Sequence, residues 1–350
     1  MPEESIKSDE SVGHPRNFVQ LEDYSNNELL DILDLADTLK SENYRNPIAA
    51  GKMLGLLFFN PSLRTKVSFE TAATHFGAST SVISPGQGSW TLEMNDGVVM
   101  DQNKTEHIKE AIQVLSQYCD ALGVRAFSTL KDKEADYQET VMKTVLKYAT
   151  VPVINLESAM SHPCQAMADW MTVRELFGKN ELSGKKLVLS WAPHPFPLPM
   201  AVPLSVLDFA TRSGMDVTLA CPAEMTPDDK FLQKFRDQSE LHDAHFNIEH
   251  DQNEALKSAN VVYAKSWAAP MIYENPIGET ELRFKKNRNW TITPSKMNNT
   301  DDAYFMHCLP VRRNVVVEDA VLDGKNAVHI QQAGNRLHVQ KAILRKLWNL

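Results

Sequence analysis

Several features are missing from the sequence, and each missing feature argues against a class of protein. No apolar run approaches the roughly 18 residues that a membrane-spanning helix needs. The four cysteines among 350 residues are scattered without a Cys-x-x-Cys pair, so they indicate neither a zinc site nor a disulfide framework. No Gly-x-Gly-x-x-Gly turn follows a strand, as a nucleotide-dependent dehydrogenase would require. The net charge of −9 disfavours a nucleic-acid partner.

The composition that remains is that of a globular protein with two domains, with 43% hydrophobic and 23% charged residues. The N-terminal residues 1–16 are polar and have no apolar signal-peptide core, so we expect a disordered leader there. We expect a first domain at 17–177, a hinge near Gly178, and a second domain at 178–336. We also expect a C-terminal helix, 337–350, to pack back on the first domain. The cysteine usage favours a reducing cytoplasm.

Alternating strand and helix patterns predict an α/β fold, with two doubly wound parallel-sheet domains joined by a hinge. The predicted strands are 53–59, 80–84, 122–127, 151–156, 187–191, 217–221, 261–265, 304–307 and 328–330. The predicted helices are 25–40, one that ends near 76, 106–118, 140–148, 163–177, 200–212, 228–237 and 339–350.

Early in the chain, a buried strand gives way to a helix. The apolar run 53–59 predicts the strand, and Pro61 breaks it before a helical pattern begins. Ser62, Arg64 and Thr65 therefore fall at a helix N-terminus, where free backbone N–H groups and the helix dipole favour an anion. Plain helix capping by Ser62 or Thr65 is the alternative. The Arg64 guanidinium in the same turn favours a pocket for a phosphate-like dianion.

Further polar side chains follow two later strands. Arg125 lies at the carboxyl end of a predicted strand, where doubly wound folds bind ligands, although a salt bridge would also explain it. Pro163 sits near the start of a predicted helix, and His162 and Gln165 are three residues apart, so they share a helix face. Both side chains can donate hydrogen bonds to a carbonyl oxygen, whereas a purely structural histidine is the alternative. Metal binding fails because no second ligand stands at helical spacing.

A third polar segment reads His307-Cys308-Leu309-Pro310-Val311-Arg312-Arg313. The His-Cys pair suggests a thiol nucleophile, but no orienting Asn or Asp is evident. A substrate that brings its own amine needs no covalent step. Arg312 and Arg313 are either solvated charges or groups that help two domains close.

Together these segments resemble the aspartate and ornithine carbamoyltransferase family. Ser-x-Arg-Thr resembles its carbamoyl-phosphate loop, and the His-Pro-x-Gln and His-Cys-Leu-Pro signatures follow in the family's order. The resemblance implies a carbamoyl-phosphate site made of Ser62, Leu63, Arg64, Thr65, Trp90, Arg125, His162, Gln165, Cys308, Leu309 and Arg336. It implies catalytic roles for Arg64, Thr65, Arg125, His162, Gln165 and Cys308. We expect no cofactor and no metal.

The second half of the chain points to one branch of that family. The Ser-Met-Gly segment by which the ornithine branch binds a free α-amino group is not found. Instead, residues 191–199 carry four prolines at alternate positions, which make a stiff extended segment. With the later Tyr-Ala-Lys-Ser-Trp segment, this pattern resembles the N-acylornithine carbamoyltransferases. The resemblance implies that the acylornithine contacts Glu157, Lys265, Cys308, Leu309 and Thr105, with Lys265 as the cation for the α-carboxylate.

The branch also implies features beyond a single site. They are a knotted crossing in the second domain, which is a rare topology, and a homotrimer in which Trp90 reaches a neighbouring subunit. In the branch, one position before a Glu-His pair separates acetyl from succinyl substrates: Glu repels the extra carboxylate of succinyl, and Pro permits it. Thr105 stands at that position here, with Lys104 beside it. The absence of a like charge favours succinyl slightly, or an enzyme that accepts both acyl groups.

We therefore expect an enzyme that carbamoylates the δ-amine of N-acetyl- or N-succinylornithine in arginine biosynthesis. Its partners are expected to be these small molecules, with neither nucleic acid nor membrane. A plain ornithine carbamoyltransferase is one alternative, and a non-catalytic metabolite-binding paralogue is another. The paralogue predicts broken signatures, whereas all three signatures are intact.

Overall fold

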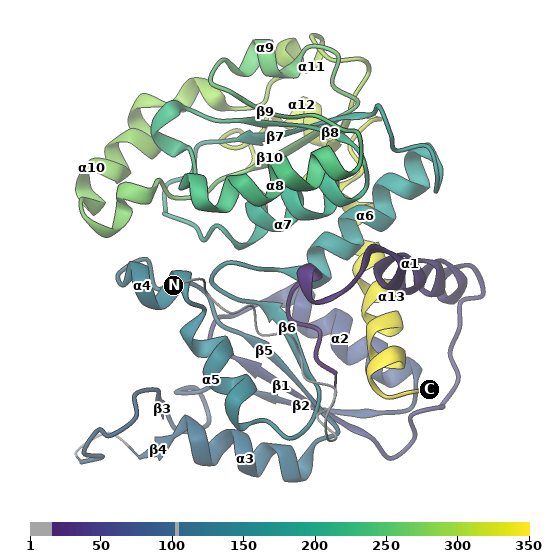
Figure 1. Cartoon of the computed structure of the whole chain (residues 1–350), viewed down its shortest axis with the longest axis vertical. Helices are drawn as coiled ribbons and strands as arrows, with labels where there is room; N and C mark the ends of the chain where they lie inside the picture. The colour runs from purple at the N-terminus through teal and green to yellow at the C-terminus, as the bar shows by residue number, and fades with distance from the viewer. Residues whose placement is uncertain (1–15, 102–104) are drawn as a thin grey trace.

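The computed structural model describes residues 16–101 and 105–350 and places them around two parallel sheets (Figure 1). The first sheet has the order β2-β1-β5-β6, from β1 (Met53–Phe58), β2 (Ser79–Ile83), β5 (Ala121–Arg125) and β6 (Val153–Glu157). The second has the order β11-β10-β7-β8-β9, from β7 (Lys186–Trp191), β8 (Asp216–Ala220), β9 (Phe246–Glu249), β10 (Val261–Lys265) and β11 (Tyr304–Met306). The predicted α/β class with parallel sheets is confirmed.

The helices follow the strands in sequence, as crossover connections between parallel strands require. In the first half they are α1 (Asn26–Ser41), α2 (Leu63–His75), α3 (Ile108–Tyr118), α4 (Lys133–Tyr137), α5 (Thr140–Tyr148) and α6 (Pro163–Phe177). In the second half they are α7 (Ala201–Arg212), α8 (Asp229–Leu241), α9 (Gln252–Leu256), α10 (Pro276–Thr280), α11 (Pro294–Met297), α12 (Asp319–Leu322) and α13 (His329–Leu347). Short strands β3 (Leu92–Glu93) and β4 (Glu106–His107) pair with each other.

Local sequence signals explain where the main elements start. The Ser25 side chain accepts from the Glu28 backbone N–H and the Glu28 carboxylate accepts from the Ser25 N–H, which is a capping box at the start of α1. Pro163 occupies the first turn of α6, where its missing N–H removes no helix hydrogen bond. The strands β1, β5 and β6 are buried almost throughout, so they read as continuous apolar runs rather than alternating ones.

The C-terminal region differs from its prediction. Residues 328–330 were expected to form a strand, but α13 begins at His329 and continues without interruption to Leu347. Val328 and Ile330 are β-branched residues, which favour strands. Packing of α13 against α1, α2 and α6 outweighs this local preference (Figure 1). The helix predicted at 337–350 thus starts earlier, and it does pack on the first half.

Other predictions compare as follows. The strand β9 was not predicted, and residues 106 and 107 form β4 rather than the first turn of a helix. The predicted hinge lies between α6 and β7, and the domain limits stay predictions, as does the knotted crossing. Residues 1–15 of the predicted leader lie outside the described residues, whereas Arg16 forms an ion pair with Glu28 at 2.7 Å.

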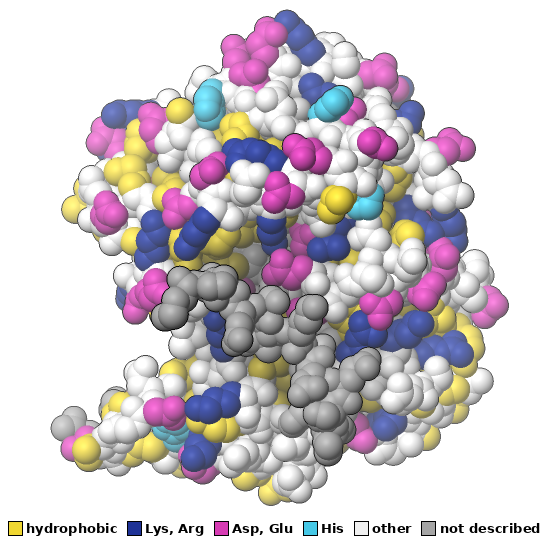
Figure 2. Space-filling model, in the orientation of Figure 1, with side chains coloured by type: hydrophobic (Ala, Val, Ile, Leu, Met, Phe, Trp, Pro, Cys, Tyr) yellow, Lys and Arg dark blue, Asp and Glu magenta, His cyan; other side chains and the backbone are white. Residues whose placement is uncertain are grey.

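The surface carries charges of both signs. Figure 2 shows Lys and Arg interspersed with Asp and Glu over one face of the molecule, rather than gathered into a large basic patch. No helix among the described residues is long and apolar enough to cross a membrane.

A glycine in the central strand β1 gives a test of the first sheet. A Cβ added to Gly55 would lie 2.7 Å from Leu122 Cδ2 and 2.9 Å from Cys119 Sγ. We expect Gly55→Ala to lower the free energy of unfolding by about 1–3 kcal/mol, because overpacking forces neighbours off their preferred rotamers. Urea unfolding followed by circular dichroism measures the change.

The matched control is Gly334→Ala in α13, where an added Cβ meets nothing within 4 Å. There we expect stabilisation of about 0.5–1 kcal/mol, because alanine is the better helix former. Equal urea midpoints for the Gly55→Ala and wild-type proteins would contradict the tight packing of β1 against β5.

Candidate active site

The turn from β1 to α2 has the geometry of an anion site. Ser62 is the N-cap of α2, and its side chain accepts a hydrogen bond from the Thr65 backbone N–H at 3.2 Å. Thr65 is fully buried, Arg64 is half-buried, and Leu63 is exposed. The predicted helix N-terminus is confirmed, so backbone N–H groups and the positive end of the dipole face the same place as Arg64 and Thr65.

Arg336 reaches this turn from the other end of the chain. It lies in the middle of α13, and its Nη2 donates to Thr65 Oγ1 at 2.7 Å. The side chain is 3% exposed, and burial lowers the pKa of its guanidinium, with Arg64 and Arg125 adding to the effect. The continuous α13, rather than a loop, therefore places Arg336 beside the anion loop.

Arg125 and Glu157 end two neighbouring strands, β5 and β6. Arg125 Nη1 donates to Glu157 Oε2 at 2.6 Å, and both side chains are buried. The Arg125 guanidinium also stacks 4.4 Å from the centre of the Phe127 ring. Arg125 therefore forms a salt bridge through one of its nitrogens, as the alternative interpretation proposed. The pair leaves Arg125 Nε buried without a partner, so the guanidinium can still serve a ligand.

His162 is a buried, neutral imidazole. Its Nε2 lies 3.5 Å from Glu157 Oε2, and its Nδ1 has no partner within the described chain. Burial lowers the pKa of His162 well below its usual range, and the charges of Arg336, Arg125, Lys265 and Arg64 lower it further. A neutral imidazole keeps one N–H, so His162 can donate one hydrogen bond to a ligand without adding a charge.

Gln165 donates to a carboxylate of its own helix. Its Nε2 donates to Asp169 Oδ1 at 2.7 Å, whereas its Oε1 is buried without a partner. The Oε1 atom of Gln165 is therefore an acceptor that remains available to a ligand. The sequence did not single out Asp169, although it stands at i+4 from Gln165 on the same helix, which is the spacing of facing side chains.

A set of buried polar atoms marks where a ligand would sit. Within residues 16–101 and 105–350, these atoms of predicted site residues lack a hydrogen-bond partner: Arg64 Nε, Arg125 Nε, His162 Nδ1, Gln165 Oε1 and Arg336 Nε. Buried polar groups are nearly always paired in folded proteins, so these atoms are candidates for contacts with a ligand. Three of the five atoms belong to guanidinium groups, and the charges of Arg64 and Arg125 act on Arg336, so the three groups lie near one another and favour an anion.

The second sheet supplies the facing groups. Lys265 ends β10 and is half-buried. Burial raises the pKa of the Cys308 thiol and outweighs the opposing effect of the Lys265 charge, so the thiol stays protonated at neutral pH. The interpretation of Cys308 as a thiolate nucleophile is therefore disfavoured. Leu309 follows, and its backbone N–H donates to His307 Nδ1 at 2.8 Å.

Two predicted residues lie apart from this cluster. Trp90 is 63% exposed in the loop before β3, and Thr105 is exposed just before β4. Neither side chain has a hydrogen bond, ion pair or ring contact with the cluster in the part of the chain that the structure describes. Lys104, which was weighed beside Thr105, lies outside the described residues.

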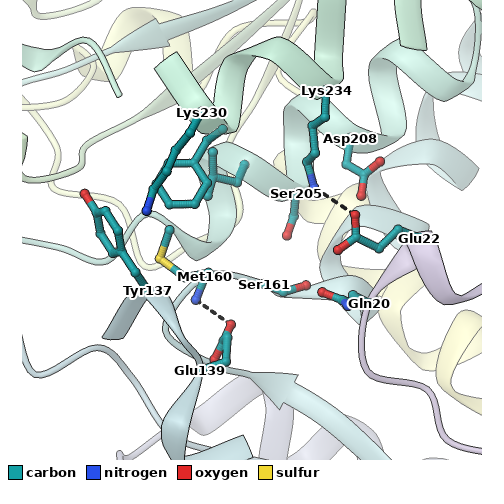
Figure 3. A pocket seen from close by; sticks show the side chains of 12 residues that line it. Gln20, Glu22, Tyr137, Glu139, Met160, Ser161, Ser205, Asp208, Lys230 and Lys234 are labelled. Atoms are coloured by element: carbon teal, nitrogen blue, oxygen red, sulfur yellow. Dashed lines mark hydrogen bonds and ion pairs between the residues drawn. The ribbon is translucent and has the colours of Figure 1, made fainter. Parts of the chain in front are cut away.

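A cavity of about 230 Å³ adjoins the site without containing any of its predicted residues. It is lined by Gln20, Glu22, Tyr137, Glu139, Met160, Ser161, Leu204, Ser205, Asp208, Lys230, Phe231 and Lys234 (Figure 3). Its carboxylates have partners: Glu22 faces Lys234 at 3.4 Å, and Glu139 accepts from the Met160 N–H at 2.8 Å. The Ser205 hydroxyl accepts from the His162 backbone N–H at 2.8 Å, so a residue that lines the cavity also holds the backbone of His162.

Comparisons with known proteins agree with this geometry. The sequence model of the aspartate/ornithine carbamoyltransferase carbamoyl-P binding domain matches residues 16–175, and that of the Asp/Orn binding domain matches residues 201–347. The chain is 42% identical over 333 residues to the N-acetylornithine carbamoyltransferase of Xylella fastidiosa, which covers 95% of this chain and 98% of the relative. It is 37% identical over 302 residues to the N-succinylornithine carbamoyltransferase of Bacteroides thetaiotaomicron, which covers 86% and 88%.

A solved structure shows the same likeness in three dimensions. Acetylornithine transcarbamylase complexed with acetylcitrulline superposes with a TM-score of 0.91 at 41% identity. The match covers 95% of this chain and 99% of the other. Both sheets and the elements that carry the site are therefore shared with that protein.

The unpartnered guanidinium groups predict that a simple dianion stabilises the fold. We expect inorganic phosphate to raise the Tm of the wild-type protein, because a ligand that binds only the native state shifts unfolding by mass action. Arg64→Ala is expected to abolish most of that rise. Differential scanning fluorimetry with a phosphate series measures it, with Arg288→Ala, an exposed arginine, as the control. Equal phosphate responses in both variants would contradict the site.

Proposed function

The chain belongs to the aspartate/ornithine carbamoyltransferase family, and we propose that it transfers the carbamoyl group of carbamoyl phosphate to the δ-amine of an N2-acylornithine. The observation that carries the proposal is the set of buried, unpartnered atoms on Arg64, Arg125, His162, Gln165 and Arg336, together with the hydrogen bond from Arg336 to Thr65 in the anion loop. The N-acylornithine relatives support the acceptor. The free, buried cysteines support our proposal of a cytoplasmic enzyme of arginine biosynthesis.

Carbamoyl phosphate offers two groups for recognition. We assign its phosphate to the N-terminus of α2 with Ser62 and Thr65, and to the guanidinium groups of Arg64 and Arg336. Thr65 already contacts both Ser62 and Arg336 in this arrangement, which reduces the entropy lost when the anion binds.

The carbamoyl group is assigned to the remaining polar atoms. Its carbonyl oxygen fits the donors, Arg125 and the neutral His162, while its NH2 group fits the acceptor Gln165 Oε1. When the neutral δ-amine attacks the carbonyl carbon, negative charge grows on the carbonyl oxygen, and these donors stabilise it as an oxyanion hole does. The new C–N bond forms, the C–O bond to phosphate breaks, and the proton lost by the amine leaves with the phosphate.

We propose that the acceptor binds on the side of the second sheet. In this proposal Lys265, at the end of β10, provides the cation for the α-carboxylate, and closure of the two halves brings Cys308 and Leu309 to the δ-amine. Glu157 is already paired with Arg125 at 2.6 Å, so in this proposal it contacts the acylornithine while holding the arginine. An acylated α-nitrogen carries no charge and needs no acidic partner.

One product assay tests the whole proposal. Carbamoyl phosphate is offered with ornithine, N-acetylornithine or N-succinylornithine, and citrulline products are measured by chromatography. We expect turnover of at least one acylornithine and little turnover of ornithine. Fast turnover of free ornithine would favour the plain ornithine enzyme instead, and no turnover of any acceptor would favour the non-catalytic paralogue.

Thr105 carries the choice between acyl groups in this proposal. We expect Thr105→Glu to raise the KM for N-succinylornithine by about tenfold or more, because two like charges a few ångströms apart cost about 1–4 kcal/mol in a partly exposed site. The KM for N-acetylornithine is expected to change little, and Thr105→Ser serves as the control. An unchanged ratio of kcat/KM between the two substrates would contradict this role.

We further propose a homotrimer in which the exposed Trp90 completes the site of a neighbouring copy. Arg64→Ala and Trp90→Ala are each expected to lower kcat/KM at least about a hundredfold, on the scale of a lost oxyanion-hole donor. In co-expressed hybrids of the two variants, activity is expected to return in part, because some interfaces then pair an intact Arg64 with an intact Trp90. Hybrids no more active than the parents, or a monomer by light scattering, would contradict the shared site.

A further inference from the structure

A buried network of amides and one carboxylate lies behind the proposed site. Asp169 in α6 is fully buried, and its Oδ1 accepts from both Gln165 Nε2 and Gln332 Nε2, each at 2.7 Å. Gln332 is also fully buried and belongs to α13, one turn before Arg336. Two helices that each carry a proposed substrate contact are thus joined through a single carboxylate oxygen.

The same glutamine extends the network to the second sheet. Gln332 Oε1 accepts from the His307 backbone N–H at 2.9 Å, and its Nε2 lies 3.1 Å from the hydroxyl of Tyr263 in β10. His307 directly precedes Cys308, and Tyr263 lies two residues before Lys265. Residues assigned to carbamoyl phosphate and residues assigned to the acylornithine therefore share one network of hydrogen bonds.

We propose that Asp169 and Gln332 are positioning residues, which hold Gln165 with its oxygen toward carbamoyl phosphate and hold the segment of Cys308 and Leu309 for the acceptor. This inference rests on the proposed function. Neither residue reaches the substrates directly: each acts through an atom that does. The network is the physical link by which the two halves of the site keep a common geometry.

The orientation of the Gln165 amide is the first consequence. The site has many donors, from Arg64, Arg125, His162 and Arg336, whereas Gln165 Oε1 is an acceptor. A glutamine amide can rotate about its last side-chain torsion at little cost, which exchanges the positions of its oxygen and nitrogen. A neighbour that binds only one of these atoms prevents that exchange. The Asp169 carboxylate accepts only from the nitrogen, so it fixes which end faces the carbamoyl NH2 group.

The charge of Asp169 is the second consequence. The titratable groups around it are the Tyr263 hydroxyl from β10, the Arg336 guanidinium from α13 and the Cys308 thiol beyond β11. Burial raises the pKa of Asp169 to about 7, against hydrogen bonds that favour the ionised form. Below that pH the carboxyl gains a proton and loses its charge, so its Oδ1 becomes a weaker acceptor for the two amides. His162 does not titrate in this range, because its pKa is lowered well below the usual value.

The decisive variants are Gln332→Met and Gln340→Met. Both glutamines are fully buried in α13, but Gln340 has no hydrogen-bond partner among the described residues and lies two turns beyond the network. We expect Gln332→Met to raise the KM for the acylornithine about tenfold and to lower kcat by a similar factor, as loss of one buried hydrogen-bonded partner typically does. Gln340→Met is expected to retain wild-type kinetics.

Two substitutions test Asp169: one removes its carboxylate group, and the other removes only its charge. Asp169→Ala is expected to lower kcat/KM for carbamoyl phosphate about tenfold or more. Asp169→Asn keeps an acceptor oxygen and is expected to restore most of that loss, while removing the fall in kcat/KM of the wild type below about pH 7. Thermal unfolding of each variant separates lost stability from lost positioning.

The outcomes distinguish this inference from the function on which it rests. A wild-type protein that carbamoylates no acylornithine overturns the proposed function. An active wild type with equal kinetics in Gln332→Met and Gln340→Met overturns the positioning role alone, as would an Asp169→Asn variant whose pH profile matches the wild type.

Discussion

The concentration of positive charge between the two sheets is the constraint on which the rest of the site depends. Burial lowers the pKa of both Arg64 and Arg336, and neighbouring guanidinium groups lower it further. Glu157 offsets part of that charge, but it is itself held by Arg125. Buried cations without enough counter-charge cost stability, so the arrangement favours binding of an anion. In the proposed function that anion is carbamoyl phosphate.

Helix α13 makes this concentration possible. The chain passes from the first sheet to the second and then returns, so that α13 packs against α1, α2 and α6 of the first half (Figure 1). That return brings Arg336 to Thr65 and Gln332 to Asp169. A C-terminal helix that stayed with the second sheet would leave the anion loop without its last arginine. The packing of one helix is thus as important to the site as the anion loop itself.

Burial also sets the protonation states that the chemistry uses. His162 is held neutral and Cys308 is held as a thiol, because the charged form of each is penalised inside the protein. Neither group has to gain or lose a proton for the amine to attack a carbonyl carbon. In the proposed reaction the site therefore works by orienting and stabilising the reacting groups, which is the usual source of rate enhancement in transfers that need no covalent intermediate.

The sequence by itself determined most of what depends on neighbouring residues. Ser62 caps a helix and Pro163 starts one, because capping involves residues within a few positions of each other. The buried strands followed from their apolar runs, and parallel strands followed from the helices between them. The three family signatures pointed to carbamoyl phosphate as a substrate and to most of the residues that the structure brings together.

Only the tertiary structure decided which side chains meet across the chain. It pairs Arg125 with Glu157, pairs the amide nitrogen of Gln165 with Asp169 and begins α13 at His329, within residues that the sequence predicted to form a strand. It also leaves Trp90 and Thr105 outside the cluster of their own chain. Each outcome depends on packing between segments far apart in sequence, and that packing energy exceeds the local preferences that a sequence pattern records.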